Sequence, residues 1–158
     1  MKKLIFPVMI MIVLAGSAFS QKSLYDRLGG QPAIEAVVGD FAGNVLADAR
    51  INKKFAKSNA PRLVKNLTDF VANATGGPVK YTGLTMKESH KKMAVTTGEF
   101  NALVEDLVKT LDKFKVPAKE KGELLAALGP LAKDIVEKKN LKTGTDLPKS
   151  FKPAPPLK

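Results

Sequence analysis

Apolar residues recur at helical spacing in four segments of the chain. In the first segment they lie at +3, +4, +7, +8, +11 and +12 from the starting residue, which is one helix face: Ile34, Val37, Val38, Phe41, Ala42, Val45 and Leu46. The second segment covers 61–74, the third follows a Thr96–Glu99 capping-box spacing, and the fourth follows Pro117. No stretch alternates as a strand does, so the pattern predicts an all-α domain.

Glycine and proline mark where these helices begin and break. Gly29-Gly30 interrupts the chain just before Pro32, which suits a first helical turn, and Ser23 is placed to cap a short helix before that break. Gly129-Pro130 falls inside the fourth segment, where proline costs about 3 kcal/mol. The helix therefore either stops or kinks there, and the apolar spacing that continues to Val136 favours a kink.

The first 20 residues have the three-part pattern of a secretory signal. A basic start at 1–3 precedes an apolar run at 4–16, and Ala18 and Ser20 are the small residues that a signal peptidase reads. The run is shorter than the roughly 20 residues of a bilayer span, although an uncleaved membrane anchor is the alternative. We expect cleavage after Ser20, export to the periplasm or medium, and no stable membrane insertion afterwards.

The remaining chain divides into a domain at 21–139 and a tail. Residues 140–158 are rich in lysine and proline and show no apolar period, so they are expected to be disordered. The net charge of +11 could suit nucleic acid or an anionic surface, but the lysines are dispersed over exposed helix positions. Only 6% of residues are aromatic and they do not interleave with the lysines, which argues against nucleic acid.

Catalytic and metal-binding residue types are scarce. The chain has one histidine and no cysteine, which excludes disulfides, thiolate metal sites, a cysteine nucleophile and haem attachment through Cys-x-x-Cys-His. The histidine is His90, with Met86 four residues before it and Met93 three after, so both methionines share its face on a short helix. This setting is compatible with an axial haem ligand, but on its own it more often belongs to an ordinary core or surface histidine.

Several ordered blocks are similar to the group 1 truncated haemoglobins. The similarity covers about residues 23–137, almost without gaps. It rests on these blocks: Ser23 to Gly30, Asp40-Phe41, Val45 to Asp48, Phe55, Gly76-Gly77-Pro78, Tyr81-Thr82-Gly83, and Met86 to His90. The resemblance implies a two-over-two helical sandwich around b-type haem, with the four periodic segments as its main helices.

The same resemblance implies roles for individual residues. His90 would bind the iron through one ring nitrogen and anchor the other by a hydrogen bond, and Phe55 would pack on the ring. The remaining haem contacts, each also a normal core residue, would be Leu63, Leu67, Phe70, Val71, Met86, Val95, Phe100, Leu103 and Leu128. Without cysteine, the haem would be held non-covalently.

The gas-binding side departs from the family pattern. Relatives typically carry a tyrosine and a glutamine that donate hydrogen bonds to the gas, whereas the matching positions here are Ala42 and Leu67, in a distal pocket with Leu63. A donor there is worth about 1–3 kcal/mol, or one to two decades in gas release. We therefore expect faster oxygen loss, easier oxidation of the iron and less discrimination against carbon monoxide.

Some polar positions near this pocket keep open roles. Asn66 is the nearest replacement donor, or else faces solvent or a haem propionate. Lys65 or Arg62 would substitute for the lysine that relatives often place near a propionate. A sixth ligand from the chain could only be Lys65 or a methionine, because there is no second histidine.

Four functions are compatible with these features. The first is reversible binding of a diatomic gas (O2, NO or CO), as a carrier or sensor. The second is oxidation of nitric oxide by a dioxygenase reaction, which needs a stable oxygenated form and a reductase. The third is an extracytoplasmic haem redox protein whose basic surface docks an acidic partner. The fourth is a helical binding module without haem.

Overall fold

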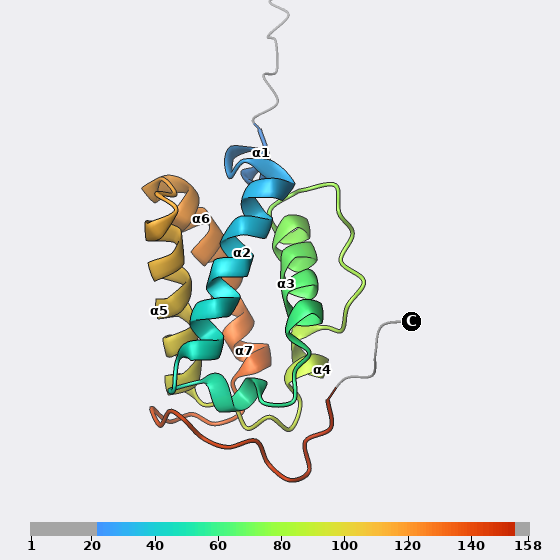
Figure 1. The fold of residues 1–158 in the computed structure, drawn as a ribbon, viewed down its shortest axis with the longest axis vertical. Helices are drawn as coiled ribbons and strands as arrows, with labels where there is room; N and C mark the ends of the chain where they lie inside the picture. The colour runs from blue at the N-terminus through green and yellow to red at the C-terminus, as the bar shows by residue number, and fades with distance from the viewer. Residues whose placement is uncertain (1–21, 154–158) are drawn as a thin grey trace, which may run out of the picture.

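The computed structural model describes residues 22–153, so the predicted signal segment and residues 154–158 lie outside it (Figure 1). The described part contains seven α-helices and two 3₁₀ turns: α1 (Leu24–Arg27), α2 (Gly30–Ala47), η1 (Asn52–Phe55), α3 (Ala60–Ala74), α4 (Met86–His90), α5 (Thr97–Lys113), α6 (Ala118–Leu128), η2 (Gly129–Leu131) and α7 (Ala132–Ile135). Within residues 22–153 no helix has the length and apolar character that a membrane span requires.

The long helices pack around one interior. Helix α2 packs against both α3 and α5, and α6 continues through η2 into α7, which contacts α4 and α5 (Figure 1). Helix α1 closes one end by packing on α2 and α6. The predicted all-α, two-over-two arrangement of a single domain is therefore confirmed.

The predicted caps and breaks are local features that the structure reproduces. Gly29 and Gly30 have φ values of 101° and 71°, the left-handed backbone that glycine adopts without strain, and α2 begins there. At the start of α1 the Ser23 hydroxyl oxygen accepts a hydrogen bond from the backbone amide of Asp26, with an oxygen-to-nitrogen distance of 3.1 Å. At the start of α5, Thr96 and its partner three residues on form the predicted capping box.

The chain stays helical across Gly129-Pro130. Gly129 (φ −54°, ψ −44°) and Leu131 (φ −66°, ψ −17°) both have right-handed helical dihedrals, and the segment between α6 and α7 tightens to one 3₁₀ turn. Proline lacks an amide proton, so an α-helical hydrogen bond is lost there and the turn tightens instead. This is the interrupted but continuing helix that the apolar spacing predicts.

Residues 140–153 contain no helix, yet they are fixed to the helical body. The amide and hydroxyl of Thr145 donate to the Glu99 carboxylate, the former at 3.0 Å. Leu147 and Phe151 pack against the buried cluster of Met93, Val95 and Ile135. The prediction of a disordered tail is therefore wrong for 140–153, because two apolar side chains and a buried carboxylate give this lysine- and proline-rich segment specific partners.

Candidate functional site

A cavity of about 1050 Å³ lies among the long helices. Helices α2, α3, α5 and α6 supply most of its lining, and the lining side chains are mainly aliphatic and aromatic. The volume is at the upper end of the roughly 300–1,000 Å³ of small-molecule sites. An apolar cavity this large between helices is suited to a bulky, mostly apolar ligand.

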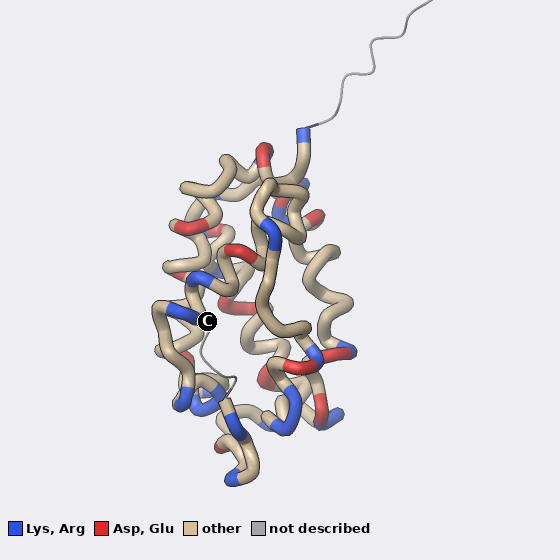
Figure 2. Tube along the Cα trace, turned by 90° about the vertical axis from the view of Figure 1, so that its right-hand side faces the viewer, with Lys and Arg blue, Asp and Glu red and all other residues tan. Residues whose placement is uncertain are grey.

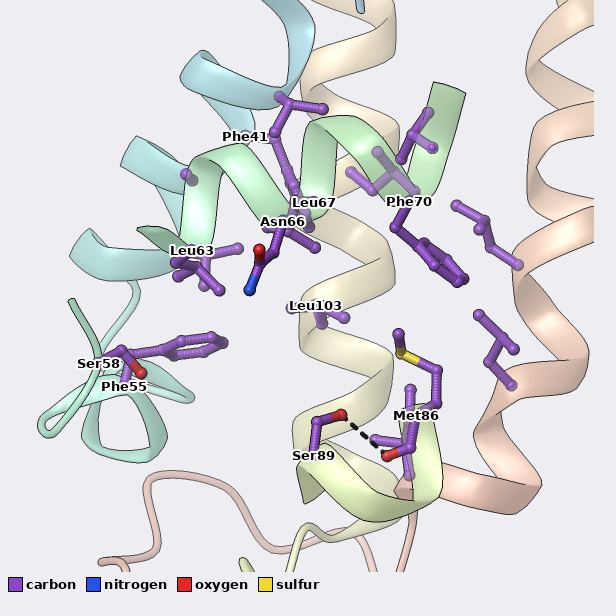
Figure 3. Close-up of a pocket in the computed structure, with 18 of the residues that line it drawn as sticks. Phe41, Phe55, Ser58, Leu63, Asn66, Leu67, Phe70, Met86, Ser89 and Leu103 are labelled. Atoms are coloured by element: carbon purple, nitrogen blue, oxygen red, sulfur yellow. Dashed lines mark hydrogen bonds between the residues drawn. The ribbon is translucent and has the colours of Figure 1, made fainter. Parts of the chain in front are cut away.

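Two facing walls define the cavity (Figure 3). Leu63, Asn66 and Leu67 extend from α3 on one side, and Met86 and Ser89 from α4 lie on the other, with open space between them. The ring of Phe55, which comes from η1, extends into the cavity at one end. Leu103 of α5 lies behind the gap.

His90 is the last residue of α4 and lines the same cavity. Its helix is short but well capped, because Thr85 and Glu88 form a capping box at its start. The ring Nδ1 lies 2.8 Å from the carbonyl oxygen of Met86 and 3.0 Å from the Ser89 hydroxyl. A carbonyl can only accept, so Nδ1 carries the proton and donates to Met86, which leaves the Nε2 lone pair available.

Electrostatics favours the neutral form of this imidazole. Burial lowers the pKa of His90, and this effect outweighs the hydrogen bond to Met86 and the charge of Glu137, which raise it. A neutral ring with Nδ1 protonated is the form that binds metals through Nε2. No hydrogen bond to Nε2 occurs among residues 22–153.

The structure brings nearly all of the predicted site residues to this cavity. The predicted positions that line it are Ala42, Phe55, Leu63, Leu67, Phe70, Val71, Met86, His90, Phe100, Leu103 and Leu128. Val95 is the exception: its side chain is buried in a cluster with Met93 and Ile135, and unlike those two residues it does not line the cavity. The cause is local, since Ala94 has a left-handed backbone (φ 52°) that redirects the chain just before it.

The α3 wall carries the polar groups nearest the predicted distal pocket. Ala42 is only 3% exposed and presents a methyl group to the cavity, and Leu67 is aliphatic. The amide of Asn66 points into the gap between the walls (Figure 3). At the same end of the cavity Lys65 forms an ion pair with Asp69 at 2.5 Å, whereas Arg62 has no ion pair among residues 22–153.

The chemistry of this donor set fits haem better than a bare metal ion. Residues 22–153 contain no group of three or more His, Asp or Glu side chains arranged to hold a metal ion. A single available imidazole nitrogen in an apolar cavity is what haem needs from a protein, because the porphyrin nitrogens already bind the iron. Basic side chains at the α3 end of the cavity suit the carboxylates of such a group.

Ser89, Phe151 and Pro153 are among the lining residues that the sequence did not predict. Ser89 reaches the His90 ring directly, and adjacency to the histidine was the signal that could have identified it. Phe151 and Pro153 line the cavity from the segment that was expected to be disordered. The spacing of two apolar residues four apart, Leu147 and Phe151, was the available indication.

Comparisons with known proteins agree with this geometry. The model of the bacterial-like globin family matches residues 23–137. The group 1 truncated haemoglobin of Mycolicibacterium paratuberculosis is 39% identical over 72% of this chain and 83% of its own, and that of Tetrahymena thermophila is 35% identical over 75% and 98%. These identities extend over most of each relative.

Solved structures show the same relationship. The truncated haemoglobin of Tetrahymena pyriformis in its Fe(III) form superposes with a TM-score of 0.71, at 33% identity over 74% of this chain and all of that one. The 2/2 haemoglobin of Synechococcus, solved with covalently attached haem, gives 0.71 at 30% identity, with 74% and 100% covered. This chain belongs to the bacterial-like globin family, among the group 1 truncated haemoglobins.

Proposed function

We propose that the protein binds b-type haem non-covalently in the cavity, with His90 as the axial ligand, and takes up a diatomic gas reversibly on the α3 side. The observation that carries this proposal is the His90 ring, whose Nδ1 is committed to the Met86 carbonyl at 2.8 Å while the ring lines an apolar cavity. When bound, the haem supplies an iron centre that can take O2, NO or CO.

The chain's own residues would orient and enclose that group. His90 offers Nε2, and Ser89 and Met86 fix the orientation of its ring. Phe55 and the aliphatic side chains of α3 and α5 exclude water from the cavity. Non-covalent binding is supported by the absence of cysteine and by the fact that the only histidine is His90 itself.

The composition of the distal side favours gas binding over catalysis. Ala42 and Leu67 cannot donate a hydrogen bond, so a bound gas with partial negative charge is weakly held there. Oxidation of nitric oxide needs a long-lived oxygenated form, and this pocket does little to stabilise it. The rate at which the oxygenated protein consumes nitric oxide would separate that alternative from simple gas binding.

The visible spectrum of protein produced with haem supplied tests the proposal. We expect a Soret band that shifts on reduction and again when carbon monoxide is added. His90→Gly should abolish or change this spectrum, and added imidazole should restore it. Lys87→Gln is the matched control, because Lys87 is an exposed residue of the same helix that does not line the cavity. A wild-type protein without haem, or a His90→Gly spectrum equal to wild type, would contradict the proposal.

Export and an acidic redox partner are further parts of this proposal. The N-terminal pattern supports cleavage after Ser20, so the mature protein should begin at Gln21 when its N-terminus is sequenced. Figure 2 shows several basic residues at the lower end of the molecule. Among the exposed lysines are Lys91 and Lys92, directly after His90, and Lys138. A redox partner docking there would carry acidic groups, and its reaction rate would fall as salt is added.

A further inference from the structure

The loop that follows His90 has a strained backbone. Lys92 and Ala94 have φ values of 65° and 52°, in the left-handed region that favours glycine, and neither is glycine. Such residues persist only when their surroundings hold them. Two of them within four residues of the candidate iron ligand make the contacts that hold this loop relevant to the site.

Two charged side chains, those of Glu137 and Lys54, bind the backbone of this loop. The Glu137 carboxylate accepts the amide of Lys92 at 2.8 Å and the amide of Ala94 at 2.6 Å. The Lys54 ammonium donates to the carbonyl oxygens of Met93 at 2.8 Å and Ala94 at 3.4 Å. The left-handed turn thus has its amides bound by a carboxylate and its carbonyls by an ammonium group.

Lys54 is part of a buried polar network. It is 4% exposed, and its ammonium lies 3.6 Å from the carboxylate of Glu99, which is 2% exposed. Glu99 also accepts the amides of Thr96 and Thr145, each at 3.0 Å, and the Thr145 hydroxyl. Removing one partner of such a network would leave a buried charge unpaired, which is strongly destabilising locally.

Through Thr145 this network reaches the segment 138–153, which we call the C-terminal segment. Leu147 and Phe151 of this segment pack against the buried cluster that contains Met93 and Val95 of the loop, and Phe151 and Pro153 reach the cavity itself. The segment lies outside the 23–137 region that matches the globin family. It therefore adds a wall to the site on the side of His90.

Gly98 shows how closely the segment lies on α5. Its amide donates to the carbonyl of Asn140 at 3.0 Å. A Cβ atom at this position would collide with the backbone of Leu141 and would come within 2.8 Å of the Lys142 carbonyl oxygen. Only glycine allows this contact, so Gly98→Ala should displace the segment although the substituted residue itself does not line the cavity.

We propose that Lys54 and Glu137 are positioning residues for His90, and that together with the C-terminal segment they retain haem in the cavity. They act by fixing the 91–95 loop, which sets where the imidazole can lie relative to the opposite wall. The inference rests on the proposed function, because the group retained is the haem. It goes further in assigning a positioning role to Lys54 and Glu137, neither of which lines the cavity.

The test compares holoproteins carrying Gly98→Ala, Lys54→Met and Glu137→Gln with wild type. One readout is the rate of haem loss to an excess of a haem-free acceptor globin. The other is the iron–histidine stretching vibration of the ferrous protein by resonance Raman, which a purely structural role would leave unchanged. We expect haem loss at least tenfold faster in all three variants, and a shifted vibration in Lys54→Met and Glu137→Gln.

Two matched controls lie away from the loop. Gly122→Ala adds a methyl group on α6 where no atom lies within 4 Å, and Lys113→Met removes an exposed lysine that pairs with Asp40. Both should lose haem at the wild-type rate. If Lys54→Met does not fold, Gly98→Ala and Glu137→Gln decide the question.

The outcomes distinguish this inference from the proposed function. One outcome would overturn the positioning role alone. In it the wild-type protein binds haem, the variants lose haem within twofold of the wild-type rate, and their iron–histidine vibration is not shifted. Wild-type protein that takes up no haem would overturn both. Faster haem loss in the controls as well would show a general loss of stability, and would also count against the assignment.

Discussion

Ala42 of α2 and Leu67 of α3 line the same cavity from two helices that pack against each other, and neither side chain can donate a hydrogen bond. The pair therefore contributes no donor that would hold an electronegative gas on the α3 side of the site. The rate of gas release should therefore respond strongly when one of these positions is given a hydroxyl group.

Ala42→Tyr should slow oxygen release by one to two decades. The phenol can donate a hydrogen bond worth about 1–3 kcal/mol to a gas with partial negative charge. Oxygen dissociation followed by stopped-flow absorbance measures the effect. Ala42→Phe supplies the same bulk without the hydroxyl, so equal rates in the Tyr and Phe variants would show that packing and not hydrogen bonding is responsible.

Asn66 is the polar group that points into the gap between the cavity walls (Figure 3). If its amide serves as the remaining donor, Asn66→Leu should speed oxygen release about five- to tenfold, equivalent to roughly 1 kcal/mol. The control Asn101→Leu changes an exposed amide on α5 and should have no effect. An unchanged rate in Asn66→Leu would mean that the amide does not reach the gas.

Arg62 and Lys65 should differ in their effect on haem retention. Lys65 is engaged with Asp69 at 2.5 Å, whereas Arg62 has no ion pair among residues 22–153 and lines the same cavity. A guanidinium also matches a carboxylate in bidentate fashion. Arg62→Gln should therefore accelerate haem loss several-fold more than Lys65→Gln, and the reverse order would assign the propionate contact to Lys65.

Asp106 should make the stability of the fold depend on pH. Burial raises the pKa of its carboxyl group, the charge of Asp48 raises it further, and Arg50 opposes both. An acid whose folded-state pKa is raised stabilises the fold while protonated, and this contribution is lost as the pH rises through that pKa. One carboxylate oxygen of Asp106 is also buried without a hydrogen-bond partner in the described part of the chain.

Asp106→Asn should therefore increase the free energy of unfolding at pH 7, and the gain should shrink as the pH is lowered towards 4.5. Urea unfolding at several pH values measures this. The control is Asp112→Asn, which changes an exposed carboxylate that pairs with Lys121. A gain that is the same at every pH would show that Asp106 is already protonated at neutral pH or that its charge is immaterial.

Features that depend on neighbours along the chain could be predicted from the sequence. Apolar periodicity located the long helices, and the Thr96–Glu99 spacing located a cap, because both are set within a few residues. The apolar lining followed for the same reason: residues on the inner face of a helix reach the interior whatever the details of packing. His90 needed the resemblance, since one histidine on an apolar face has many ordinary explanations.

Features that depend on distant partners could not be predicted. Lys54 reads as one more surface lysine until the carbonyls of the 91–95 loop and Glu99 surround it. The resemblance implies that Val95 lines the cavity, but the left-handed backbone at Ala94 turns it elsewhere. Residues 140–153 have a composition that predicts disorder. Composition gives the average polarity of a segment, and it does not reveal the two apolar side chains that hold this one in place.

The division of the apolar interior has a consequence for how the protein acquires its folded state. The buried residues form three separate clusters, around Val45, Val38 and Met93, and the cavity lies between them. A chain without a ligand in that space lacks the continuous core that makes small domains unfold cooperatively. Haem binding would link the three clusters and add its own binding free energy to folding. The amount of folded protein would then follow the supply of haem, so the cofactor would act as an assembly factor as well as a gas site.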